Sequence, residues 1–211
     1  MNAWIRSPWT KTAAALLACG ACFALGRAAA QEEPAGGGAE AGAFEMPEWT
    51  QKGPEHEEMA RLAGDWDVTT RIWMAPGQPP MESGGSATTE LLYDGRFVRQ
   101  SMQADMMGVP FEGTWIGGYD RVSAEYVSIW FDSMSTYLSV SRGKPDGEAV
   151  VYEMNDPDWM TGEKKKTRLR MEWSGDDAYL LTFLDKGPDG ADVKQMEIGF
   201  KRRKAADDSG E

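Results

Sequence analysis

The only histidine of the chain lies among carboxylates that could help it bind a metal. His56 is surrounded by three glutamates, Glu55, Glu57 and Glu58, and imidazole with carboxylate is a donor set for transition metals. A Gly-Pro pair just before this segment predicts that it is helical, and adjacent positions on a helix do not face one point. We therefore predict that His56 hydrogen-bonds to the backbone or to solvent, and that the chain has no metal site.

Two aspartates have the residue type for acid–base chemistry and stand near the ends of successive predicted strands. Asp120 directly precedes a turn over residues 121–124, and Asp132 precedes Ser133 at the next bend. At such positions an aspartate accepts hydrogen bonds from turn amides. We therefore predict structural roles for both and assign no catalytic residue, which makes an enzyme that uses these carboxylates the least favoured function.

The sequence lacks the common motifs of catalysis and cofactor binding. It contains no Gly-x-Ser-x-Gly elbow, phosphate-binding loop, dinucleotide fingerprint or zinc-ligand spacing. We therefore predict no cofactor.

Tryptophan and methionine are abundant, with nine Trp and 13 Met. Tryptophan is costly to use unless it is buried, and methionine adapts to irregular apolar surfaces. These residues either fill a solid core or line an apolar cavity. If a cavity exists, we predict that Arg99 and Asp132 are its orienting polar groups and that its wall also contains four aromatic residues: Trp115, Tyr119, Tyr126 and Trp130.

One short helix is predicted before a series of strands. Gly53-Pro54 fits a helix start, and the acidic residues that follow suit the positive end of the helix dipole. Met59, Leu62 and Ala63 form one apolar edge of this segment. We expect the helix to lie as a lid or plug against something larger.

After Gly64 the hydrophobic period changes to two, which is typical of strands. In the first strand, Trp66, Val68 and Thr70 alternate with polar residues and are expected to point inward. About ten strands are predicted: Trp66 to Met74, Ser86 to Tyr93, Phe97 to Met106, Phe111 to Tyr119, Glu125 to Asp132, Tyr137 to Ser141, Ala149 to Met154, Thr167 to Trp173, Tyr179 to Leu184 and Val193 to Phe200.

The predicted strands are joined by short segments with turn chemistry. Examples are Asp94-Gly95, Pro145-Asp146-Gly147, Gly175-Asp176 and Pro188-Asp189-Gly190, which favour tight reversals. Short reversals imply an antiparallel meander, and closure of such a sheet removes its unpaired edges. The fold class is therefore all-β, an antiparallel up-and-down β-barrel of a size that can enclose a ligand cavity.

The two ends of the chain differ in composition from this barrel. Arg6 and Lys11 precede an apolar stretch over residues 12–26, and Ala28-Ala29-Ala30 offers a small-residue cleavage site, so residues 1–30 are predicted to be a signal peptide. Residues 31–45 are predicted to be a flexible linker, residues 46–204 the barrel domain and residues 205–211 a disordered tail.

The predicted signal peptide contains both cysteines, so the mature chain would have none. Leu16-Leu17-Ala18-Cys19 loosely matches a lipoprotein processing box, which leaves a lipid anchor at Cys19 as an alternative to soluble export. An uncut signal that acts as an anchor is a further alternative. A membrane is an expected partner only in these anchored forms.

The charge of the chain excludes some partners. It has 34 acidic and 22 basic residues, and removal of residues 1–30 leaves 19 basic residues, a net charge of −15. A chain of this sign repels phosphate backbones and anionic membranes. We therefore predict that it binds no nucleic acid; no sequence feature indicates an oligomeric state.

A series of spaced motifs resembles an exported bacterial family known as domain of unknown function 1579, which is similar to lipocalin-like (calycin-type) barrels. The motifs are Gly53-Pro54-Glu55-His56, Gly64-Asp65-Trp66, Asp94-Gly95-Arg96-Phe97, Gly118-Tyr119-Asp120 and Trp130-Phe131-Asp132-Ser133-Met134. The resemblance covers residues 46–203. It implies a barrel that carries a small, often apolar molecule, and no assigned activity.

The resemblance also implies two statements about single residues. In lipocalin-like barrels a basic residue of the last strand covers the tryptophan of the first, a role open here to Arg202 or Arg203 against Trp66. Related haem-binding barrels use a histidine near the C-terminal end, whereas His56 lies near the start of the domain. Haem ligation of that type is therefore not expected.

These observations predict a periplasmic or secreted, non-enzymatic barrel that binds a small apolar or amphipathic ligand. The main alternative is a protein-interaction module presented at the cell surface on the 31–45 linker. Such a module would need an exposed apolar patch, for which Trp159-Met160 in the loop 157–163 is the candidate.

Overall fold

The computed structural model describes residues 45–75, 77–106, 108–158 and 161–204. A 3-10 turn, η1 (Glu48–Thr50), and one short helix, α1 (Pro54–Ala60), precede all the strands. The helix begins where the Gly53-Pro54 pair predicts, because proline preorganises the first helical position and needs no backbone partner there. A single short helix before the barrel was expected and is confirmed.

Ten strands follow, and they form one closed antiparallel barrel, as predicted. Each strand pairs with its neighbours in the chain, and the last strand pairs with the first. The strands are β1 (Gly64–Ile72), β2 (Met81–Leu92), β3 (Phe97–Met106), β4 (Val109–Asp120), β5 (Glu125–Asp132), β6 (Ser139–Asp146), β7 (Ala149–Pro157), β8 (Lys164–Trp173), β9 (Ala178–Lys186) and β10 (Asp192–Arg202).

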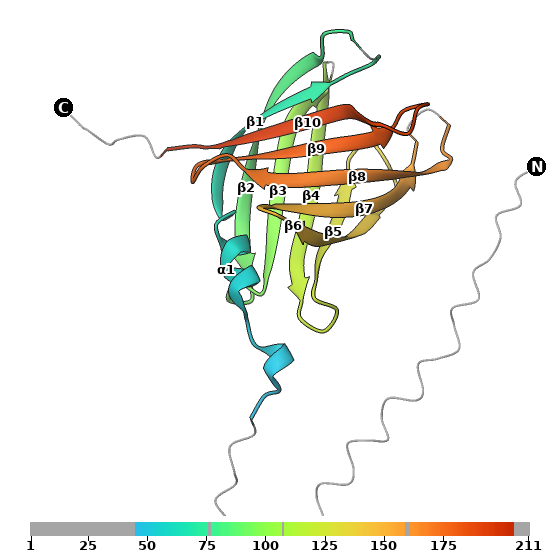
Figure 1. Cartoon of the computed structure of the whole chain (residues 1–211). Helices are drawn as coiled ribbons and strands as arrows, with labels where there is room; N and C mark the ends of the chain where they lie inside the picture. The colour runs from blue at the N-terminus through green and yellow to red at the C-terminus, as the bar shows by residue number, and fades with distance from the viewer. Residues whose placement is uncertain (1–44, 76, 107, 159–160, 205–211) are drawn as a thin grey trace, which may run out of the picture. The chain divides into compact units, whose positions relative to one another are not determined.

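The strands cross steeply on the two sides of the barrel. In Figure 1, β2, β3 and β4 run nearly upright, whereas β8, β9 and β10 run across them. Helix α1 contacts β3 and β4 at one end of the barrel. The hairpins β2–β3, β4–β5, β6–β7 and β8–β9 all turn at this same end, so the ends of these eight strands lie at the end of the barrel where the helix lies.

Side chains alternate between the barrel interior and solvent, which fixes the register of each strand. In β1, Trp66, Val68 and Thr70 are buried as predicted. In β5, where the sequence left both faces open, Tyr126 and Ser128 are buried, while Phe131 is exposed. One cluster of the core lies beside β1, where the Tyr179 and Phe200 rings stack 4.3 Å apart between ring centroids.

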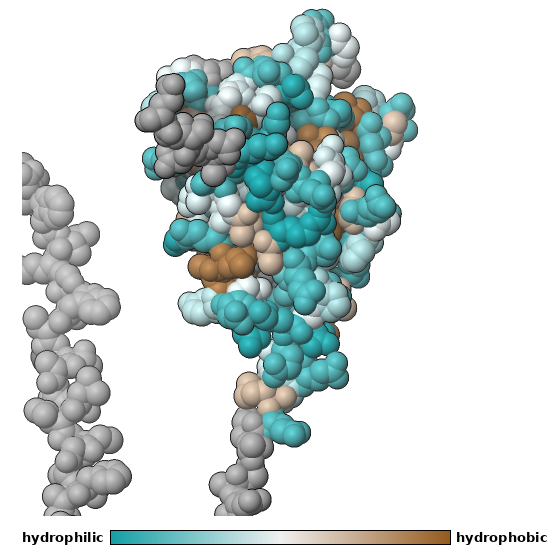
Figure 2. Space-filling view, turned by 90° about the vertical axis from the view of Figure 1, so that its left-hand side faces the viewer, coloured by the Kyte–Doolittle hydropathy of each residue, from teal (hydrophilic) through white to brown (hydrophobic). Residues whose placement is uncertain are grey.

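The outer surface is mainly polar. Figure 2 shows one face of the barrel on which hydrophilic residues predominate and apolar side chains form separate small groups. Within the described ranges, α1 and η1 are too short to cross a bilayer, and no other helix there could do so.

Candidate functional site

Helix α1 is held at its N-terminus by the histidine that the sequence singles out. The Gly53 backbone N–H donates to Nδ1 of His56 over 3.0 Å, which satisfies one of the free amides of the helix start. The His56 ring is buried and meets the Tyr119 ring edge-on, 5.9 Å between centroids. Burial holds the pKa of His56 below its ordinary value. The histidine therefore has the predicted role, a hydrogen bond to the backbone.

The other end of α1 is fixed to the first and last strands. The indole N–H of Trp66 donates to the Leu62 carbonyl over 2.9 Å. The guanidinium of Arg202 lies 4.3 Å from the centre of the Trp66 ring and donates to the carbonyls of Arg61 and Ala63, each over 2.7 Å. Arg202 therefore has the covering role that the resemblance left open between two residues.

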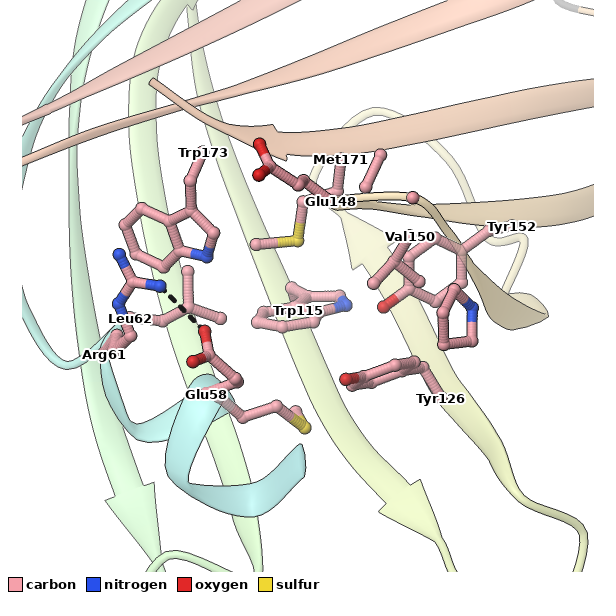
Figure 3. A pocket seen from close by; sticks show the side chains of 14 residues that line it. Glu58, Arg61, Leu62, Trp115, Tyr126, Glu148, Val150, Tyr152, Met171 and Trp173 are labelled. Carbon is pink, nitrogen blue, oxygen red and sulfur yellow. Dashed lines mark hydrogen bonds and ion pairs between the residues drawn. The ribbon is translucent and has the colours of Figure 1, made fainter. Parts of the chain in front are cut away.

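Beneath α1 the barrel contains a cavity of about 400 Å³. The structure thus supports both interpretations of the aromatic residues, because a packed core lies beside β1 and a hollow lies toward β4–β8. Figure 3 shows the hollow from close by. Its lining comprises Glu58, Met59, Arg61 and Leu62 from the helix side, Trp115, Tyr126, Tyr152, Met171 and Trp173 from strands, and Pro145, Gly147, Glu148, Ala149 and Val150 from the β6–β7 hairpin.

The helix side of the cavity carries an ion pair. Nη1 of Arg61 lies 2.7 Å from Oε2 of Glu58, one helical turn earlier, and the guanidinium lies 4.1 Å from the centre of the Trp173 ring. Both charged groups are therefore engaged with each other, and the arginine also covers an aromatic face. This corner leaves no unpaired cation for a ligand.

Two tyrosines form the opposite wall. Tyr126 of β5 and Tyr152 of β7 both face Gly143 of β6 across the sheet. A side chain at Gly143 would collide with the Tyr152 ring, because its Cβ would lie 2.7 Å from Cδ1 of that ring. The glycine therefore allows the Tyr152 ring to lie against the backbone of β6 and leaves space beside Tyr126.

Trp115 occupies the centre of the cavity wall in Figure 3. Its indole N–H donates to Oγ of Ser128 over 2.9 Å. Its ring lies over Gly117, where any Cβ would overlap the six-membered part of the indole. The hydrogen bond to Ser128 thus fixes the orientation of this ring, and the absence of a side chain at Gly117 leaves the space that it occupies.

The structure brings together part of the predicted site. Trp115 and Tyr126 line the cavity. Tyr119 is adjacent to them, with its ring centroid 5.0 Å from that of Tyr126, but it is not a lining residue and faces His56. The ligand-binding role of these residues remains a prediction.

Three predicted residues lie elsewhere. Trp130 and Asp132 are toward the other end of β5, where the indole N–H of Trp130 donates to Asp132 over 3.0 Å. Arg99 points outward from β3 and pairs with Glu90, because inward positions in this strand alternate with it. Arg99 was predicted to be an orienting polar group of the cavity. The register of β3 instead places its side chain on the outer surface.

The two candidate acid–base groups act in turns. Asp120 accepts hydrogen bonds from the hydroxyl of Ser123 and from the backbone of Val122, and these bonds lower its pKa. Asp132 accepts from the backbone amides of Met134 and Ser135. Both carboxylates therefore have the structural role that turn chemistry predicts.

Metal binding and surface interaction remain as the other sequence-based candidates. Among residues 45–75, 77–106, 108–158 and 161–204, no group of three His, Cys, Asp or Glu side chains could hold a metal ion. Trp159-Met160, the candidate surface patch, lies outside the described residues.

Sequence reasoning missed most of the cavity lining. It recognised Met59 and Leu62 as an apolar helix edge but did not connect them with Tyr152 or Met171, which lie more than 80 residues away in the chain. The available signal was Gly143, which lies two residues beyond the predicted strand Tyr137 to Ser141 but inside β6. A glycine within a strand indicates close approach of a neighbouring group.

Comparison with known proteins gives a family and two similar folds. The sequence matches the family described as "Protein of unknown function (DUF1579)" over residues 51–202, which confirms the resemblance seen in the spaced motifs. No curated protein matches the chain. The crystal structure of Rv2717c from M. tuberculosis is similar, with a TM-score of 0.47 and 13% identity, over 73% of this chain and 100% of that chain. The S-type phycobiliprotein lyase CPES from Guillardia theta has a TM-score of 0.47 and 11% identity, over 72% of this chain and 94% of that one.

Proposed function

Since the chain belongs to the DUF1579 family, whose matched region contains the whole cavity, we propose that this barrel binds a small apolar or amphipathic molecule beneath α1. The observation that carries the proposal is the cavity of about 400 Å³ bounded by aromatic and methionine side chains. Its volume falls within the range of small-molecule sites, about 300–1,000 Å³.

The chemistry of the lining supports binding rather than catalysis. Trp115, Tyr126 and Tyr152 offer apolar faces, while the one basic lining group, that of Arg61, is paired with Glu58. The aspartates considered for acid–base chemistry are occupied by turn amides. The cavity therefore offers apolar surface and a few polar contacts, the usual composition of a small-molecule binding site.

We also propose that the protein is exported to the periplasm or secreted, and that it reaches its ligand there. The support is the order of segments at the N-terminus: basic residues, a short apolar stretch and a small-residue site ending at Ala30.

The test is a fluorescence titration with N-phenyl-1-naphthylamine, a compact uncharged dye that brightens in apolar surroundings. The wild-type chain is expected to bind the dye at one site. Val150→Phe adds a ring to the cavity wall, and we expect it to weaken binding by about tenfold or more, because an overpacked site costs roughly 1–3 kcal/mol.

Val151→Phe is the matched control. Val151 pairs with Arg170 on the outer face of the same strand, so its enlargement is expected to leave dye binding within about twofold of wild type. Equal binding by both variants would place the dye outside the cavity, and absence of binding to the wild type would refute the carrier function. Native mass spectrometry of the purified chain adds a dye-free measurement of any co-purified ligand.

A further inference from the structure

Two hydroxyl groups inside the cavity have no protein partner. Tyr126 and Tyr152 are only 9% and 4% exposed, and among the described residues neither hydroxyl makes a hydrogen bond to protein. In the described residues, every fully buried side-chain oxygen has a hydrogen-bond partner. Because these two oxygens have none, they are accessible to a small molecule such as water. Both hydroxyls therefore open onto the cavity.

The two hydroxyls serve one space. Tyr126 and Tyr152 lie in the same register on either side of Gly143, which puts their Cα atoms roughly 10 Å apart, two strand spacings. Because Gly143 has no side chain, nothing from β6 stands between the rings. In Figure 3 both hydroxyl ends point toward the region around Trp115.

The charges around this space disfavour an ionised occupant. Among the described lining residues Arg61 is the one basic side chain, and it pairs with Glu58. Burial raises the pKa values of both tyrosines, and for Tyr126 the negative charges of Glu55 and Glu58 raise it further. An anion here would meet negative potential without a counter-charge, and the hydroxyls remain protonated donors.

A cation is also poorly matched. Glu58 faces Arg61, and Glu148 stands on the β6–β7 hairpin rather than between the two tyrosines. An ammonium group beside the two hydroxyls would lose its hydration, and the second carboxylate of the lining, that of Glu148, lies on the hairpin and not beside these hydroxyls. A neutral oxygen can instead accept from the tyrosines and replace the water that otherwise satisfies them.

We propose that the occupant is a compact apolar molecule with one uncharged oxygen group, a carbonyl or hydroxyl, that hydrogen-bonds to Tyr126 and Tyr152. The rest of the molecule packs on Trp115, Met171 and the apolar edge of α1. This inference rests on the proposed carrier function and specifies the head group of its ligand. The cavity has the volume of roughly a dozen water molecules, which limits the size of the ligand.

The experiment compares four ligands that share one aromatic ring system. 2-Acetylnaphthalene has a neutral carbonyl, naphthalene has no polar group, 2-naphthoate is an anion and 2-naphthylmethylammonium is a cation. Each is titrated into the full chain loaded with N-phenyl-1-naphthylamine. We expect 2-acetylnaphthalene to displace the dye at about tenfold lower concentration than the other three, because it alone gains hydrogen bonds from the tyrosines without bringing a charge into the cavity.

Phenylalanine variants test the two hydroxyls. Tyr126→Phe and Tyr152→Phe are each expected to weaken 2-acetylnaphthalene by about fivefold, since one hydrogen bond contributes about 0.5–1.5 kcal/mol. Neither should change the affinity for naphthalene. Because the hydroxyls have no protein partner, both variants should melt at or above the wild-type temperature. Tyr93→Phe, on an exposed turn, is the matched control and should change nothing.

The outcomes separate this inference from the carrier function. If dye and naphthalene bind but 2-naphthoate or the ammonium compound binds as well as 2-acetylnaphthalene, the head-group assignment is wrong and the carrier function stands. The same conclusion follows if both phenylalanine variants bind 2-acetylnaphthalene like wild type. If the wild-type chain does not bind the dye, the carrier function itself fails.

Discussion

At the scale of single residues, His56 links helix α1 to pH. Its Nδ1 accepts the Gly53 amide proton, so the neutral ring is the form that fits the fold. Burial lowers its folded-state pKa below the ordinary value of 6.5. Below pH 6.5 the unfolded chain therefore binds a proton that the folded chain does not, and this histidine's contribution to stability falls as the pH falls.

His56→Gln should remove this dependence. Glutamine at the third helical position can also accept from the amide that precedes the helix, so the helix start is retained without a titrating group. We expect the free energy of unfolding, measured by urea titration, to drop more for wild type than for the variant between pH 7 and pH 5. The drop attributable to His56 should level off below its folded pKa. Parallel curves for the two proteins would mean that His56 titrates normally in the folded state.

At the scale of elements, the pairing of β6 with β7 sets the shape of the cavity. We predict that Gly143→Ala displaces the Tyr152 ring, because the new Cβ would lie within 2.7 Å of it. The expected result is a lower melting temperature, and an affinity for N-phenyl-1-naphthylamine reduced by about threefold or more, a change of roughly 0.7 kcal/mol.

Gly84→Ala is the control for that substitution. Gly84 lies in β2, where a Cβ would come no nearer than 4.0 Å to its closest neighbour, the Val68 carbonyl oxygen. Its replacement should leave dye affinity unchanged. If Gly143→Ala binds the dye like wild type, the Tyr152 ring does not shape the binding site.

The elements themselves were predictable to different degrees. Strands β3 and β5 have the bounds predicted from the sequence, since turn residues precede each of them directly, Asp94-Gly95 before β3 and the turn 121–124 before β5. Strand β2 begins at Met81 rather than at Ser86, because the Ser-Gly-Gly segment 83–85 carries no strand signal and is held by its pairing with β1. Strand β6 runs through Pro145-Asp146, which the sequence assigned to a turn.

The candidate site was less predictable than the strands, because closure of the barrel brings together residues that are far apart in the sequence. Trp115 and Tyr126 could be identified because large aromatic residues on inward positions must line something. The approach of Leu62 to Met171 and Tyr152 depends on how far the barrel turns between β1 and β8, which no local pattern encodes. Arg99 was misplaced because its charge was weighted above the alternation of its own strand.

At the scale of the whole molecule, the proposed export has a direct test in the intact mass of the protein from its native cell. Cleavage after Ala30 predicts a mature chain that starts at Gln31 and carries no cysteine. A lipid anchor would instead leave a chain that starts at an acylated Cys19. We expect the first mass, and we expect Cys19→Ser to leave both the mass of the mature chain and its location unchanged. Recovery of the full-length mass from the exported fraction would contradict cleavage.

The contacts of Arg202 also determine when the molecule can fold. Its guanidinium joins carbonyls that precede it by 139 and 141 residues, and β10 seals the barrel against β1. On a ribosome, the first strand of the nascent chain therefore has no partner on one side until the last strand has been made. Closure is a single late event of high contact order, and such events are slow compared with helix formation. Until β10 has been made, β1 lacks the partner on that side and Trp66 lacks the guanidinium that covers it in the folded barrel.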